Sequence, residues 1–138
     1  MPASPRTTTQ RPVDEKLTIN LGVVDLGQVD LLVREGFYSN RSDLIRTAIR
    51  RELERHADTV REAVERRTLV LGIREFTVGD LEAARDAGEK LVVKVLGLAS
   101  FAPDVTPELA LQTIESITVL GALHASPELK KALSSRLH

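Results

Sequence analysis

The feature that most constrains this chain is a short segment in which polar and apolar residues alternate without a break, Lys16-Leu17-Thr18-Ile19-Asn20-Leu21. A period of two predicts a half-buried strand whose apolar side chains face a core. No second strand pattern follows until Thr68, and a lone strand has an unpaired edge. Pairing with the same strand of a second molecule would make a two-stranded antiparallel ribbon, and therefore a symmetric homodimer.

The residues after this strand predict a first helix. Asp25, followed three residues later by Gln28, is a variant of the capping box, and apolar residues then recur at helical spacing. We therefore expect a helix over residues 26 to 35. Gly36 stands where a left-handed C-cap is expected.

A second helix is expected next, with Ser39 or Ser42 as its N-cap. Its pattern continues to about residue 67 with a thinner apolar stripe. The apolar stripe of its first turns is Leu44, Ile45, Ala48, Ile49 and Leu53. Its outward face is basic, since residues 37–51 contain four arginines and a single acid, Asp43. The net charge of the whole chain is only -1, so this local patch is what suits a limited phosphate footprint.

Strand, helix, glycine-containing turn and capped helix, in this order, closely resemble the CopG/Arc/MetJ ribbon-helix-helix family of DNA-binding proteins. The resemblance rests on Lys-Leu-Thr-Ile-Asn-Leu at 16–21 and on Gly-Phe-Tyr-Ser-Asn-Arg-Ser-Asp-Leu-Ile-Arg-Thr-Ala-Ile-Arg at 36–50. It covers residues 15 to about 55. It implies a homodimer whose paired strands enter the major groove of operator DNA.

The resemblance also implies roles for particular residues. Lys16, Thr18 and Asn20 would meet base edges, where Lys can donate to guanine, Asn can pair with adenine and Thr can contact thymine. The start of the second helix would meet the phosphate backbone, as free N–H groups and the helix dipole favour. The residues in that position are Ser39, Asn40, Arg41 and Ser42. The dimer core would comprise Leu17, Ile19, Leu21, Leu44, Ile45, Ala48 and Ile49.

The C-terminal half contains an internal repeat. Three strand-like segments, 68–72, 93–97 and 117–121, recur at intervals of 25 and 24 residues, and each ends in Val-Leu-Gly. Each is followed by a helix-forming stretch, and Thr106-Pro107-Glu108 and Ser126-Pro127-Glu128 are helix starts with a hydroxyl cap and proline at the first position. Alternating strands and short helices predict parallel pairing, as a small α/β layer or a short solenoid.

Several classes of function have little support in the sequence. The chain has no cysteine, and its three histidines, His56, His124 and His138, lack ligand spacing, so we expect neither a metal site nor another cofactor. It has no catalytic triad order, glycine-rich phosphate loop or close carboxylate pair, so we expect no enzyme. No segment is apolar enough to span a membrane, and no secretory signal is present. A cytoplasmic, DNA-associated protein is expected.

These observations predict an α+β chain with three parts: a flexible arm at 1–14, a ribbon-helix-helix domain at 15–67, and a strand-helix repeat region at 68–138. The expected function is a transcriptional regulator, and more specifically a repressor. The repeat region would bind an effector, a protein partner or another dimer, which would give a tetramer on DNA. Two other functions fit the pattern: an antitoxin that regulates its own promoter, and a self-assembling structural protein.

Overall fold

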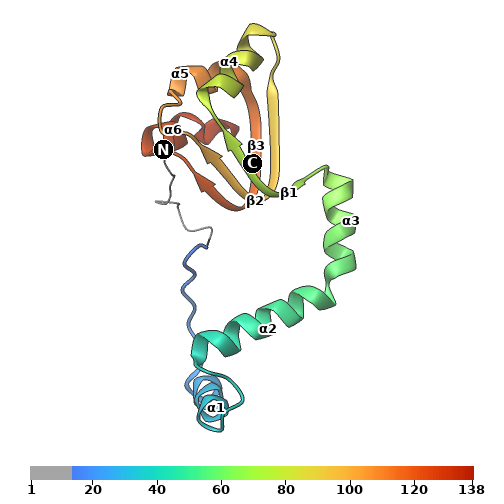
Figure 1. Ribbon diagram of the computed structural model, residues 1–138, viewed down its shortest axis with the longest axis vertical. Coiled ribbons are helices and arrows are strands. Elements are labelled where there is room, and N and C mark those ends of the chain that lie inside the picture. Colours follow the sequence, from blue (N-terminus) through green and yellow to red (C-terminus); the bar gives the residue numbers. More distant parts are fainter. Residues whose placement is uncertain (1–13) are drawn as a thin grey trace, which may run out of the picture. The chain divides into compact units, whose positions relative to one another are not determined.

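The computed structural model describes residues 14–138. Its elements are α1 (Val23–Arg34), α2 (Arg41–Arg55), α3 (Ala57–Arg67), β1 (Val70–Phe76), α4 (Val78–Asp86), β2 (Leu91–Phe101), α5 (Pro107–Thr113), β3 (Ile114–His124), α6 (Pro127–Ala132) and the 3-10 helix η1 (Ser134–Arg136) (Figure 1). Helices and a sheet together agree with the predicted α+β class. The described residues form two compact units, which we call the N-terminal unit (14–63) and the C-terminal unit (64–138). The predicted arm, apart from Asp14, lies outside the described residues.

The first helix begins earlier than predicted. Gly22 occupies the N-cap and makes no side-chain capping bond, so the predicted capping box at Asp25 is wrong. Asp25 lies instead in the first turn, where a negative charge is still favourable beside the helix dipole. The predicted C-cap is confirmed, because Gly36 has a φ of 86°. Its N–H donates to Val33 O, and the next N–H donates to Leu32 O, which together form a Schellman motif.

The second helix is capped by neither of the two predicted serines. Asn40 is the N-cap, and its side chain accepts a 2.8 Å hydrogen bond from the Asp43 N–H. Asn is as good an N-cap as Ser, so local sequence alone does not separate the neighbouring candidates. The predicted extension is helical as α3, but His56, with φ -106° and ψ 15°, separates it from α2.

Residues 14–22 form neither helix nor strand. A β-strand requires a hydrogen-bonded neighbour, and the described remainder of the N-terminal unit is helices and their connecting turn. Within the described N-terminal unit this segment therefore has no strand to pair with, and the ribbon stays a prediction.

The C-terminal unit is built on a three-stranded parallel sheet with the order β1-β2-β3. The repeat seen in the sequence sets its register, because Gly72 lies beside Gly97, and Gly97 beside Gly121. Each strand is followed by a helix, as predicted. A capping box starts α4, where the Thr77 hydroxyl accepts from the Asp80 N–H and the Asp80 carboxylate accepts from the Thr77 N–H. This bond from the Thr77 backbone holds the pKa of Asp80 below its usual value.

The core of the chain lies between this sheet and its helices. It unites helix residues such as Leu81, Leu109 and Leu129 with strand residues such as Val95 and Ile117. Phe76 and Phe101, in neighbouring strands, stack with ring centroids 5.0 Å apart. All three helices α4, α5 and α6 contribute to this one cluster, and α5 contacts both α4 and α6. The helices therefore cover one face of the sheet (Figure 1).

Candidate nucleic-acid interface

The predicted base-reading side chains, Lys16, Thr18 and Asn20, lie on the extended segment before α1 and are all exposed. Their spacing of two residues puts them on one side of that segment when it is a strand. The structure therefore leaves these three polar groups accessible to a ligand.

The N-terminal unit has no buried residues in any of its helices. Leu17, Ile19 and Leu21 are 77%, 50% and 41% exposed, respectively. Of the α2 residues predicted for the dimer core, Leu44 and Ile45 are half-buried, whereas Ala48 and Ile49 are exposed. Further large apolar side chains are exposed nearby, namely Val23, Val24, Leu31, Leu32, Phe37 and Leu53. Monomeric soluble proteins rarely expose large apolar patches, so this many exposed apolar side chains in one small unit indicate a surface that a partner covers.

The residues predicted to contact phosphate lie at the start of α2. Asn40 caps the helix, and the Ser39 N–H donates to the Asp43 carboxylate at 2.9 Å. Among the described residues, the hydroxyls of Ser39 and Ser42 make no hydrogen bond. Free hydroxyls beside the positive end of a helix can donate to an anion.

Arg41, in the same set, has a charged partner. Its guanidinium makes two hydrogen bonds to Asp30 of α1, of 2.7 and 2.8 Å. These bonds hold the pKa of Asp30 below its usual value and raise that of Arg41. No local pattern indicated this pair, because the two residues lie eleven positions apart in different helices. Both side chains are about half exposed, so Arg41 can exchange Asp30 for another anion at little cost.

The outward arginines of α2 add positive charge to the same unit. Arg46, Arg50 and Arg51 are exposed, and within the described part of the chain none of them forms an ion pair. Arg55, further along, is neutralised by Glu52 at 2.9 Å. The unpaired cations are therefore concentrated in the first three turns of α2.

The assignment of the α2 cap can be tested directly. Asn40→Ala should lower the free energy of unfolding by about 1 kcal/mol, because the Asp43 N–H loses its acceptor. Ser39→Ala is the matched control, and we expect it to change stability by less than about 0.5 kcal/mol, as for other surface substitutions. Urea titrations at one fixed protein concentration measure both values. A larger loss for Ser39→Ala than for Asn40→Ala would contradict the assignment.

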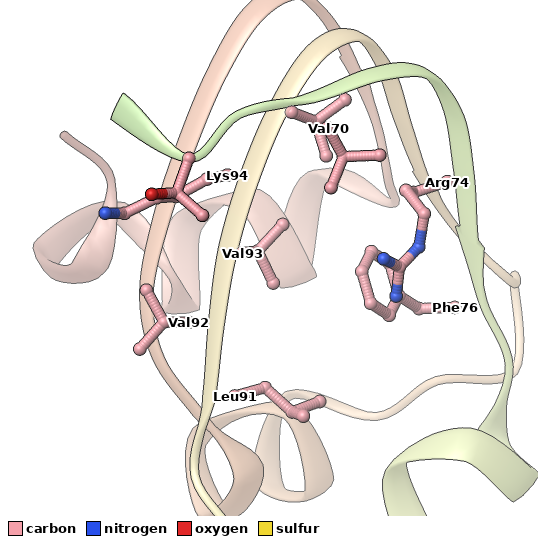
Figure 2. A pocket seen from close by; sticks show the side chains of 9 residues that line it. Val70, Arg74, Phe76, Leu91, Val92, Val93 and Lys94 are labelled. Carbon is pink, nitrogen blue, oxygen red and sulfur yellow. The ribbon is translucent and has the colours of Figure 1, made fainter. Parts of the chain in front are cut away.

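The C-terminal unit contains a hollow of about 410 Å³ that is lined by residues along β1 and by the first half of β2. Its lining is mostly apolar. The Arg74 guanidinium, which also lines the hollow, lies over the Phe76 ring, 5.1 Å from the centre of that ring. Figure 2 shows Val93, Arg74 and Phe76 on one side of β2, whereas Val92 and Lys94 point to the other side. A cation beside an apolar wall suits a small ligand with an apolar body and a negative group.

Among residues 14–138, no group of three or more potential metal ligands occurs. No helix in that range is long and apolar enough to cross a membrane.

Comparison with known families gives one match. Residues 12–130 match the Ribbon-Helix-Helix transcriptional regulator family. The matched range extends far beyond residues 15 to 55, so most of the C-terminal unit is part of the family pattern as well. No curated protein and no solved structure matches the chain.

Proposed function

Since the chain belongs to the ribbon-helix-helix transcriptional regulator family, we propose that it is a repressor that binds operator DNA as a homodimer. In this proposal residues 16–21 of two copies pair as an antiparallel ribbon, which enters the major groove. Lys16, Thr18 and Asn20 then read base edges. Ser39, Asn40, Arg41 and Ser42 hold the flanking phosphates, and the protein resides in the cytoplasm on its operator.

The observation that carries the proposal is the exposed apolar surface of the N-terminal unit. Leu17, Ile19 and Leu21 alternate with the three polar residues, so a ribbon with its apolar side inward has its polar side outward. The half-buried Leu44 and Ile45, together with Ala48 and Ile49, supply further apolar surface from α2. A dimer that buries this surface presents two sets of base-reading side chains related by two-fold symmetry. Its operator is accordingly an inverted repeat.

Asn20→Ala tests the proposed reading of bases. The variant should fold and dimerise normally, and it should lose about 1–3 kcal/mol of discrimination at one base pair of each half-site. Arg50→Ala is the matched control, because Arg50 lies on the outward face of α2 and should leave base preference unchanged. Competition binding with operator variants measures both. If Asn20→Ala discriminates between base pairs as well as the native chain does, Asn20 does not read a base.

The C-terminal unit supports a regulatory role more than the two alternatives. Antitoxin tails are typically polar and disordered before they bind, whereas this unit has a buried core of its own. A structural protein would use the repeats to polymerise and would show no salt-sensitive DNA affinity. We propose instead that the unit modulates DNA binding through an effector in the hollow beside Arg74, or by joining dimers into a tetramer on DNA.

A further inference from the structure

The face of the sheet that the helices leave uncovered is apolar. Two adjacent rows cross all three strands on this side, Leu71-Leu96-Leu120 and Ile73-Leu98-Ala122, as the strand register shows. We call these six residues the outer face. In the described chain Leu71 is 70% exposed, Ile73 is 54% exposed and Leu120 is 48% exposed. Parallel sheets occur almost only with both faces covered, so a single layer of helices leaves this sheet incomplete.

We propose that the outer face packs against the outer face of a second copy of the chain. The proposal rests in part on the homodimer proposed above, because that dimer supplies the second copy. Only Thr68 and Leu69 separate the end of α3 from the start of β1. Two chains joined through their N-terminal units therefore hold their sheets at a high local concentration, of the order of millimolar for a short connection.

The charges at the two ends of the outer face fit a second copy in one orientation. Lys94 lies before the apolar rows and Glu75 lies after them, on the same side of the sheet by strand alternation. Neither makes an ion pair among residues 14–138. When two copies pack with antiparallel strands, the Lys94 of each lies near the Glu75 of the other. A parallel arrangement would put like charges together instead, which is unfavourable.

This orientation places the middle of β2 closest to the symmetry axis. Leu96 and Leu98 lie on either side of the midpoint between the charged ends, so the Leu96 of each chain should face the Leu98 of the other, with the two Leu96 residues close to the axis. Packed sheets are about 10 Å apart. That separation is too long for a disulfide but within reach of a short bis-maleimide cross-linker.

Because the chain contains no cysteine, one introduced thiol gives an unambiguous readout. Leu96→Cys in the full chain should give a covalent dimer with the bis-maleimide. Glu82→Cys is the matched control, since Glu82 is exposed on α4, on the helix side of the sheet. We expect at least a tenfold higher yield of cross-linked dimer for Leu96→Cys. Equal yields for the two variants would mean that the two C-terminal units are only close to each other and do not pack through the outer face, which would overturn the proposal.

A second variant distinguishes packing of the two outer faces from the nearness that the N-terminal dimer alone would cause. Leu71→Glu with Leu120→Glu should leave the chain folded, since both side chains are largely exposed, and should abolish the cross-link in the Leu96→Cys background. A thiol at position 96 that is protected from maleimide but not cross-linked would mean that another segment of the same chain covers the face, which also overturns the proposal. If the Leu96→Cys chain is a dimer that binds DNA but gives no cross-link, the packing of the outer faces is overturned and the proposed function is not. A cross-linked chain without DNA affinity would overturn only the proposed function.

Discussion

Ile19→Asp should convert the protein from a dimer into a chain that no longer dimerises through its N-terminal unit. In the proposed ribbon, Ile19 lies between Leu17 and Leu21 on the side that becomes buried. Two buried, unpaired carboxylates per dimer cost several kcal/mol each, so we expect a loss of at least about 4 kcal/mol, roughly a thousandfold in the dimer Kd. Sedimentation equilibrium over a concentration series measures this change.

The neighbouring position supplies the control for this experiment. Thr18→Asp puts the same charge on the outward side of the ribbon, where it should leave dimerisation unchanged and abolish DNA binding by repelling the phosphates. If Ile19→Asp dimerises as well as the native chain, the ribbon is wrong. If the two variants behave alike, the assignment of the two sides is wrong.

Gly97→Ala should unfold or severely weaken the C-terminal unit. Gly97 has a φ of 140°, and a Cβ added there would overlap the backbone carbonyl of Gly72 in the neighbouring strand. A backbone conformation of this kind costs an L-residue about 1–3 kcal/mol, and a steric overlap inside the sheet adds about as much again. We therefore expect a total loss of about 2–6 kcal/mol in urea unfolding followed by circular dichroism.

Gly72→Ala separates these two costs. Gly72 has a comparable φ of 129°, but a Cβ there would meet no atom within 4 Å. It should therefore lose only the conformational part, about 1–3 kcal/mol. Gly121→Ala, whose Cβ would overlap the Gly97 carbonyl, should behave like Gly97→Ala. Equal losses at positions 72 and 97 would contradict the close approach of the strands.

The repeat of the C-terminal unit could be predicted from the sequence because each copy carries its own local signals. Thr106-Pro107 and Ser126-Pro127 start helices where expected, with hydroxyls that accept from Leu109 N–H and Leu129 N–H. The glycines that end the three copies lie side by side in the sheet, so the sequence repeat coincides with the register of the strands. The sequence did not show which sheet face would remain uncovered, since that depends on all three helices lying on the same side.

Prediction was weaker at the helix starts of the N-terminal unit. Gly22 and Asn40, rather than Asp25 and the two serines, occupy the caps, since several adjacent residues can accept the same N–H and only the folded backbone decides among them. The Arg41–Asp30 pair depends on the contact between α1 and α2, which no local pattern encodes. The ribbon itself needs a second chain, so only its alternation is visible in one sequence.

Selection from a random duplex library with the purified protein measures whether the chain is a dimeric, sequence-specific reader of DNA. The enriched site is then titrated across a salt series. We predict an inverted repeat whose affinity falls steeply with salt, because several phosphates are neutralised in each half-site. Absence of any enriched sequence, with only weak binding that does not depend on sequence, would contradict the claim.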